Sequence, residues 1–291
     1  MYRVLHISKQ AVHQRLNLYL KRKEEQYQLL PLIRQVREDH PRMSAKKMYR
    51  LIKPQTMGRD RFEALCFENG FKVQTRRSPQ RTTNSLGVTR FENHLKGREL
   101  TGINQVWVSD ITYYRIRESF YYLTFIMDLY SRSIVGYRAS EKLLCKQTTI
   151  PALEMAITEQ KPDAGMLVHS DGGGQYYSKE FIELTRYTGI INSMAESVYE
   201  NPHAERVNGI IKNEYLAGYQ PQNFKQLQQM LAKAVFMYNY QRPHDSLNNL
   251  SPKEFEYRLA TQSTINQVIN KKKKEAKKKN LTTITTNIAN S

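Results

Sequence analysis

The chain has 291 residues and carries 45 Lys and Arg residues against 27 Asp and Glu residues, a formal net charge of +18. This excess favours a nucleic acid as partner, with a generically basic protein such as a ribosomal protein as the alternative. The two cysteines, Cys66 and Cys145, exclude a disulfide scaffold and a cysteine-rich zinc module, and no apolar run is long enough to span a membrane, so we expect a cytoplasmic protein.

The first 75 residues predict short helices separated by tight turns. The expected helices cover residues 9–20, 29–39, 44–52 and 58–70. Ser8 and Ser44 stand where an N-cap side chain accepts a backbone hydrogen bond, and Asn69-Gly70 is a common C-terminal stop. Short basic helices with tight turns are typical of a helix-turn-helix DNA-binding region, which we place at residues 1–75; a plain helical bundle is the alternative.

Two further segments are basic and lack sustained periodicity. Residues 76–97 are polar and predict a linker whose cations suit contacts with DNA phosphates. Residues 263–291 include the run NKKKKEAKKKN, whose charge density predicts disorder. This tail either adds non-specific DNA affinity or is merely solvated.

Residues 98–262 are expected to form an α/β core. Three β-rich runs at 105–117, 119–131 and 133–140 are joined by short polar turns and predict an antiparallel meander. The expected elements that follow are a helix at 145–160, a strand at 165–171, a helix at 178–189, a strand at 191–197 and a helix beginning at Asn201-Pro202. This order of elements is that of the ribonuclease-H-like fold.

Two aspartates of this core stand in contexts that suit metal binding. Asp110 lies in a strand that alternates Val106, Val108, Asp110 and Thr112 against Trp107, Ile111 and Tyr113. A carboxylate there is costly to bury unless it is paired or metal-bound; a strand-end aspartate that faces solvent is the alternative. Asp171 follows an apolar strand and precedes Gly172-Gly173-Gly174, which leave space beside the carboxylate for phosphate and metal. The alternative for Asp171 is an ordinary Asp-Gly turn.

Glu205 gains its interest from the helix on which it is expected to lie. Asn208 and Lys212 share its face, and Lys212 is two turns on, about 10 Å away by helix rise. The opposite face is an apolar stripe: Val207, Ile210, Ile211 and Tyr215. Two aspartates near strand ends and a glutamate on a helix are what a two-metal phosphoryl-transfer site requires. An ordinary solvated face is the alternative.

Three other residues carry weaker expectations. Asp128 ends the second strand run, and we interpret it as structural, with Arg132 as a candidate ion-pair partner. Arg242 and His244, in the run YNYQRPH at a helix end, are expected either to contact DNA or to brace the core.

Six segments of the chain form an ordered set. They are WVSDITYY, YLTFIMDLYSRSIVGY, HSDGGGQYYS, INSMAES, NPHAERVNGIIKNEY and YNYQRPHDSLNNLSP. In this order they resemble the OrfB-type transposases of the insertion-sequence three family, which share a catalytic core with retroviral integrases. The resemblance implies a ribonuclease-H-like, integrase-type core preceded by an all-α region, of which residues 31–75 look like the family's second helix-turn-helix segment.

The resemblance also implies roles for individual residues. Asp110, Asp171 and Glu205 match the catalytic DDE triad, which would bind two Mg²⁺ or Mn²⁺ ions, and Lys212 matches the basic residue two helical turns on. Asn208, Arg242 and His244 join Lys212 as candidate DNA contacts. The chain departs from the family in a shorter spacing between Asp171 and Glu205 and in DGGGQY, where the family usually has an arginine and a serine.

The implied function is cleavage at insertion-sequence ends and strand transfer into target DNA by two-metal phosphoryl transfer. The expected partners are double-stranded DNA, further copies of the chain in a synaptic complex, and an upstream OrfA-type subunit, separate or fused by translational frameshifting. Two alternatives stay open: a catalytically silent, transposase-derived DNA-binding protein, and a ribonuclease-H-like nuclease that cuts without joining.

Overall fold

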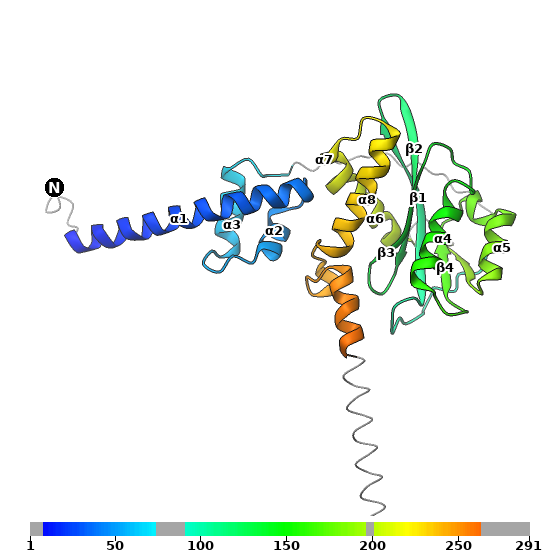
Figure 1. The fold of residues 1–291 in the computed structure, drawn as a ribbon. Coiled ribbons are helices and arrows are strands. Elements are labelled where there is room, and N and C mark those ends of the chain that lie inside the picture. Colours follow the sequence, from blue (N-terminus) through cyan, green and yellow to red (C-terminus); the bar gives the residue numbers. More distant parts are fainter. Residues whose placement is uncertain (1–7, 74–90, 196–200, 263–291) are drawn as a thin grey trace, which may run out of the picture.

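The computed structural model describes residues 8–73, 91–195 and 201–262. An N-terminal helical region lies beside an α/β domain (Figure 1). Most of the expected linker and the whole lysine-rich tail, residues 263–291, lie outside the described residues, so the expectations for them and for the domain boundaries stay predictions.

Three helices make up the N-terminal region: α1 (Lys9–Asp39), α2 (Ala45–Ile52) and α3 (Arg59–Glu68). Ser8 and Ser44 cap the first two as predicted, and the third ends before Asn69-Gly70. The prediction of separate helices over residues 9–20 and 29–39 was wrong, because α1 is continuous with Pro31 inside it. Residues 21–28, KRKEEQYQ, are mostly good helix formers, and packing of the following turns against α2 and α3 offsets the hydrogen bond that proline removes.

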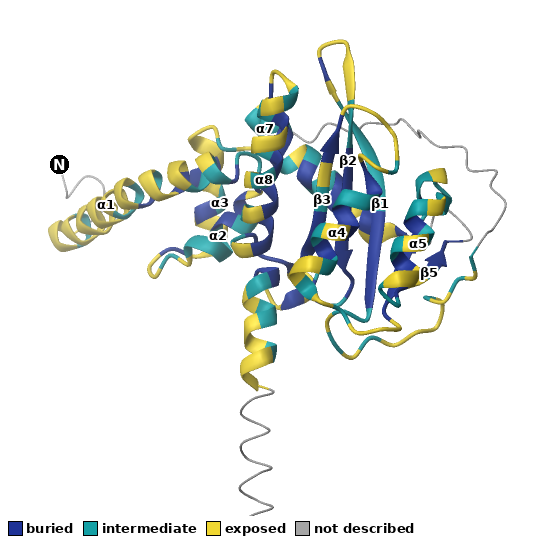
Figure 2. Cartoon of the chain, turned by 45° about the vertical axis from the view of Figure 1, so that its right-hand side comes forward, coloured by how far each residue is buried: buried dark blue, intermediate teal, exposed yellow. Residues whose placement is uncertain are grey.

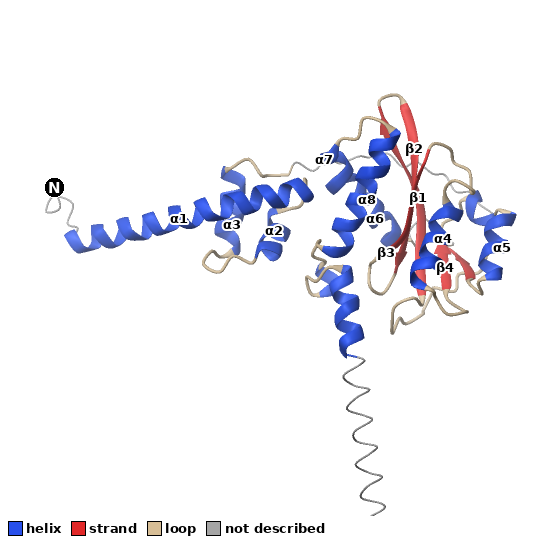
Figure 3. Cartoon of the chain, viewed as in Figure 1, coloured by secondary structure: helices blue, strands red, loops and turns tan. Residues whose placement is uncertain are grey.

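The α/β domain is built on one mixed, five-stranded sheet (Figure 3). Its strands are β1 (Val106–Ile116), β2 (Ser119–Asp128), β3 (Ile134–Ser140), β4 (Leu167–Ser170) and β5 (Ile191–Met194), in the order β3-β2-β1-β4-β5. The pairs β1–β2 and β2–β3 are antiparallel, which confirms the predicted meander. β4 and β5 extend the sheet in parallel to β1.

Helices bury both faces of this sheet (Figure 2). On one face α4 (Thr149–Gln160), the 3-10 turn η1 (Gly174–Tyr177) and α5 (Lys179–Tyr187) enclose a core that includes Trp107, Leu153 and Phe181. On the other face α6 (Pro202–Ile210) and α8 (Phe224–Tyr240) pack on Val106 and Val108. Alternate residues of β1 therefore belong to different cores, as the alternating pattern predicted.

The helix that begins with α6 contains a π-helical turn. α6 continues directly into the π-helix η3 (Ile211–Leu216) and then into α7 (Ala217–Tyr219). A π-turn adds a residue to the turn, so side chains beyond it point in directions that an unbroken α-helix would not give them.

The N-terminal region docks on this π-turn. His40 Nδ1 lies 3.0 Å from the Tyr215 hydroxyl, and the Arg42 amide donates to the Glu214 carbonyl at 3.1 Å. Gly218 sits so close that a Cβ atom there would lie 2.4 Å from Pro41 Cβ. The two parts of the chain thus share a tightly packed contact.

A short 3-10 turn, η4 (Asp245–Leu247), and a helix over residues 252–262 complete the described chain.

Candidate active site

The parallel pairing of β1 and β4 brings Asp110 and Asp171 to the same edge of the sheet. Ser109 of β1 pairs with Ser170 of β4, and the next residue on each chain is an aspartate. Side chains alternate along a strand, so Asp110 shares the face of Val106 and Val108, against which α6 packs. The two aspartates therefore lie beside α6.

Each carboxylate oxygen of Asp110 accepts one hydrogen bond. Oδ1 accepts from the Ile111 amide at 2.8 Å, and Oδ2 accepts from Asn208 Nδ2 at 2.6 Å. Burial, and after it the negative charges of Asp171 and Glu205, raise the pKa of this carboxyl to about 8, against the Ile111 hydrogen bond and the charge of Lys212. Asp110 thus lies within electrostatic range of both other predicted carboxylates.

Asp171 is held by the glycine turn that follows it. Its Oδ1 accepts from the Gly173 amide at 3.2 Å, and a Cβ at Gly173 would lie only 3.1 Å from that oxygen. Burial raises the pKa of Asp171 as well, against the hydrogen bond from Gly173. The bond from the Gly173 amide is that of an Asp-Gly turn, the alternative given for this residue, and the expected space for phosphate and metal stays a prediction.

Glu205 lies in the first turn of α6, which starts at Asn201-Pro202 as predicted. The Asn201 side chain does not cap the helix; its Nδ2 donates to the Ser109 carbonyl at 3.0 Å. This bond ties the start of α6 to the residue before Asp110. It accounts for the nearness of an exposed helical glutamate to a buried strand aspartate.

Asn208 and Lys212 both face β1. Besides the bond from Asn208 to Asp110, Lys212 Nζ donates to Thr112 Oγ1 at 3.0 Å and lies 5.0 Å from the centre of the Tyr113 ring. Burial lowers the pKa of Lys212, while the charge of Asp110 raises it. The alternative of an ordinary solvated face was therefore wrong for these two positions, because β1 covers them.

The donor atoms of this site fit a hard divalent cation. Asp110 feels the charges of Asp171 and Glu205, and the buried oxygens Asn201 Oδ1, at the start of α6, and Asn208 Oδ1, on α6, have no hydrogen-bond donor among the described residues. Oxygen atoms of this kind are the ligands that Mg²⁺ and Mn²⁺ prefer. Within residues 8–73, 91–195 and 201–262, no three His, Cys, Asp or Glu side chains already stand close enough to hold an ion.

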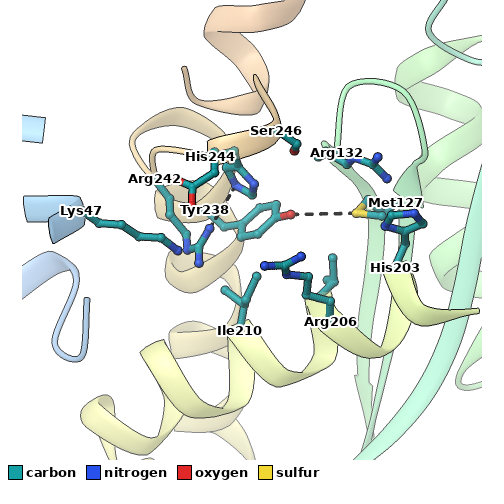
Figure 4. A pocket seen from close by; sticks show the side chains of 12 residues that line it. Lys47, Met127, Arg132, His203, Arg206, Ile210, Tyr238, Arg242, His244 and Ser246 are labelled. Atoms are coloured by element: carbon teal, nitrogen blue, oxygen red, sulfur yellow. Dashed lines mark hydrogen bonds between the residues drawn. The ribbon is translucent and has the colours of Figure 1, made fainter. Parts of the chain in front are cut away.

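Asp128 is structural, as interpreted. Its side chain is 1% exposed and accepts hydrogen bonds from the amides of Asn104, Tyr130 and Ser131. The expected ion pair with Arg132 was wrong: only the Arg132 amide bonds to Asp128, through its carbonyl. The three amides already satisfy the carboxylate, and the Arg132 guanidinium extends into a cavity instead (Figure 4).

That cavity, of about 260 Å³, also receives Arg242 and His244. We call it the basic pocket; its principal lining residues are Lys47, Arg132, His203, Arg206, Tyr238 and Arg242. Arg242 is 3% exposed and forms two hydrogen bonds with Glu214, at 2.7 and 2.8 Å. His244 is buried with its ring edge-on to Tyr238. These contacts support the bracing role that the sequence left open for both residues.

Comparison with known proteins identifies the family of the chain. Two models, each described as "Integrase core domain", match residues 101–197 and 189–252. An uncharacterized 31 kDa protein of insertion element IS600 from Shigella sonnei is 34% identical over 204 residues, which cover 68% of this chain and 75% of the relative. Transposase InsF for insertion sequence IS3A of Escherichia coli (strain K12) is 33% identical over 163 residues, 54% of this chain. The chain belongs to the IS3 family of transposases.

As a member of this family, the transposase is an enzyme of the DNA transposase and integrase class with an integrase-type, ribonuclease-H-like core. The match spans about half the length of InsF, 55%. Among solved structures, the magnesium complex of the HTLV-2 integrase catalytic core domain is similar with a TM-score of 0.45 and 24% identity, covering 53% of this chain and 96% of that domain. No helix of the described residues is long and apolar enough to cross a membrane.

Three contributors to the site were missed from the transposase sequence. The buried Tyr176 hydroxyl lies 2.8 Å from Ser109 Oγ; burial and the charges of Asp171 and Asp110 raise its pKa. Thr112 positions Lys212, and Asn201 joins α6 to β1. Tyr176 stands two residues after the DGGG run, which was the one available signal; the other two depend on contacts between distant segments.

Proposed function

We propose that the chain is a metal-dependent DDE transposase that cuts DNA at the ends of its insertion sequence and joins those ends to target DNA. Asp110, Asp171 and Glu205 are the residues that would hold two Mg²⁺ or Mn²⁺ ions. The observation that carries the proposal is the β1–β4 pairing, which sets Asp110 beside Asp171 while Asn208 of α6 bonds to Asp110. Burial, Asp171 and Glu205 raise the pKa of Asp110 to about 8. Such a cluster of carboxylates favours a cation between them.

Held by Asp110, Asp171 and Glu205, two metal ions would supply activation of the attacking oxygen and stabilisation of the leaving oxygen of a phosphodiester. The protein's own task is then to orient its donors. Asn208 and the Ile111 amide hold the two oxygens of Asp110, and the Gly173 amide holds Asp171. Ligands fixed by such outer contacts need little reorganisation on binding.

Lys212 is the residue placed to meet a DNA phosphate beside the carboxylates. Thr112 and the Tyr113 ring hold its ammonium group on the Asp110 side of the helix. A cation there offsets the charge that a phosphate brings next to three carboxylates. No covalent link between protein and DNA is required, because water and a DNA 3′-hydroxyl serve as nucleophiles.

The proposed partners follow from the same reaction. Joining two ends calls for a homo-oligomer on double-stranded DNA, and the basic helices within residues 1–75 are proposed to bind the element ends. An upstream OrfA-type subunit, separate or fused, is a further proposed partner.

A strand-transfer assay tests the proposal. Labelled DNA ends from the element's own flanks are incubated in Mg²⁺ with wild type, Glu205→Gln, Asp171→Asn and the control Glu183→Gln, whose exposed glutamate lies on α5. Joined product is expected with wild type and the control only, while all four proteins bind DNA within about tenfold of one another, because phosphate contacts supply most of the affinity.

Each other outcome of this assay refutes one part of the proposed function. Cut but unjoined DNA from wild type would indicate the nuclease. An equal collapse of binding in Glu205→Gln and Asp171→Asn would make those residues structural. If wild type makes no product, the assay is repeated with the OrfA–OrfB fusion, and a second failure would indicate the silent DNA-binding protein.

A further inference from the structure

Arginines with no acidic partner meet in the basic pocket. Arg132 comes from the turn between β2 and β3, and Arg206 from α6 (Figure 4). Within the described part of the chain neither forms an ion pair, whereas Arg242, also in the pocket, is bound to Glu214. Arg132 Nη1 is buried without any hydrogen-bond partner. A buried guanidinium without an acceptor is costly unless a ligand supplies one.

The backbone at Arg132 adds an independent observation. Its φ angle is +64°, a left-handed conformation in which glycine or asparagine is the usual choice. An arginine at this position carries backbone strain that a glycine would avoid. Since Arg132 does not pair with Asp128, its side chain gives no compensating contact with that carboxylate. The strain is consistent with a use for the guanidinium in the cavity.

We propose that the basic pocket binds a backbone phosphate of DNA, held by Arg132 and Arg206. The cavity of about 260 Å³ is several times the roughly 30 Å³ share of one water molecule, so it admits a phosphate group with bridging water. At its floor the Tyr238 hydroxyl has only the Met127 thioether, 3.9 Å away, as acceptor. A phosphate oxygen is a far better acceptor than a thioether.

DNA is the favoured source of that phosphate because of where the pocket lies. Arg206 follows Glu205 on α6 and its side chain points about 100° away around the helix axis, so the pocket and the carboxylate site use different faces of one helix. One DNA strand offers a phosphate about every 3.4 Å along the helix axis, so a strand that passes α6 can meet both faces. Lys47 brings α2 of the N-terminal region to the same cavity. One phosphate would thus lie between the proposed DNA-binding helices and the carboxylates. This assignment rests on the proposed function for its ligand.

Two variants test the pocket without disturbing the core. Arg132→Gly removes the guanidinium and suits the positive φ angle, and Arg206→Gln changes an exposed side chain. The matched control is Arg186→Gln, an exposed arginine on α5, which covers the other face of the sheet. DNA affinity of the full chain is measured by fluorescence anisotropy across a series of KCl concentrations, with EDTA present so that no cleavage occurs.

Each pocket variant is expected to weaken binding and to reduce the slope of log K against log[salt] by about one, the signature of one lost phosphate contact. Arg186→Gln is expected to retain the wild-type slope. Unchanged slopes in both pocket variants, or an equal change in Arg186→Gln, would overturn the proposal. Circular dichroism melting establishes that each variant is folded.

A second arm distinguishes DNA from free phosphate. The melting temperature is measured in potassium phosphate and in KCl at equal ionic strength, for wild type and Arg206→Gln. If phosphate stabilises only wild type while the DNA slopes do not change, the pocket holds free phosphate and the DNA assignment is wrong. Reduced DNA slopes support the assignment, whether or not free phosphate also binds.

The result is separable from the proposed function. Glu205→Gln joins no DNA but should keep the wild-type salt slope in EDTA. If the pocket variants show reduced salt slopes but wild type never joins DNA, the phosphate-binding role of the pocket stands and the catalytic proposal is refuted. Unchanged slopes in a protein that joins DNA would refute the pocket alone.

Discussion

Removal of the charge of Glu214 should destabilise the α/β domain strongly. Glu214 lies in the π-turn and makes two short hydrogen bonds to Arg242, while Lys47 lies 3.6 Å from the same carboxylate. In Glu214→Gln the buried guanidinium loses its only paired carboxylate within the described residues. Breaking a buried pair from one side costs about 3–5 kcal/mol. The glutamine oxygen retains one bond and Glu214 is 26% exposed, so we expect about 3 kcal/mol, at the lower end of this range.

The assay uses the single tryptophan of the chain. Trp107 is fully buried in β1, so its fluorescence reports unfolding of the α/β domain in urea. The control is Glu118→Gln, which removes one partner of the exposed pair Arg115–Glu118 and should change the free energy of unfolding by less than about 1 kcal/mol. If Glu214→Gln costs no more than this control, the pair is not the buried, stabilising contact described above.

The stability lost in Glu214→Gln should depend on pH, and the pKa of Glu214 gives the direction of that dependence. Burial alone would raise the pKa of Glu214, but the hydrogen bonds and charge of Arg242 outweigh it, and the pKa lies below its usual value of 4.5. A lowered pKa contributes stability above the unfolded-state value, and this stability is lost as the pH falls through the folded-state value. The difference between wild type and Glu214→Gln should therefore shrink below about pH 4.

Three further predictions concern stability and the site. Gly218→Ala places a methyl group 2.4 Å from Pro41 Cβ and should lower the free energy of unfolding in urea by about 1–3 kcal/mol. Gly209→Ala, whose nearest atom lies at 3.9 Å, should not lower it. Equal effects of the two substitutions would contradict the close contact. Burial and then Arg242 lower the pKa of His244 from 6.5 to about 2. The free energy of unfolding of wild type should therefore fall by up to about 1.4 kcal/mol per pH unit below pH 6.5, and that of His244→Gln should fall less. Parallel pH profiles of the two proteins would refute this. Asn208→Leu removes the hydrogen bond to Asp110 and should raise the Mg²⁺ concentration for half-maximal strand joining about 10–100-fold; an unchanged Mg²⁺ dependence would count against that role.

Much of the fold and the position of the carboxylates could be predicted because their signals are local. Alternation along β1 assigned Asp110 to the face shared with Val106 and Val108, and both residues do pack in the α6 core. The Asn-Pro start of α6 is a short-range signal too, and it predicted the first residue of that helix correctly. The roles of the carboxylates in binding metal stay predictions.

The errors concern what each element packs against. Asn208 and Lys212 have the spacing of a solvated face, and only the placement of α6 over β1 makes them partners of Asp110 and Thr112. Arg132 was paired with Asp128 by sequence proximity, whereas backbone amides satisfy that carboxylate. The basic pocket draws its residues from α2, the β2–β3 turn, α6 and α8, which no local pattern relates.

The π-turn η3 also separates two tasks on one helix. Before it, Glu205 and Asn208 serve the carboxylate site; after it begins, Glu214 and Tyr215 contact the N-terminal region. Deleting one residue from Ile211–Leu216 would restore an ordinary α-helix and turn everything downstream by about 100°. Ile211 and Leu216 of this turn also lie in the core of the α/β domain, so such a deletion would disturb that core together with the contact to the N-terminal helices. The length of this one helical turn, and not only its side chains, therefore sets how the two parts of this transposase fit together.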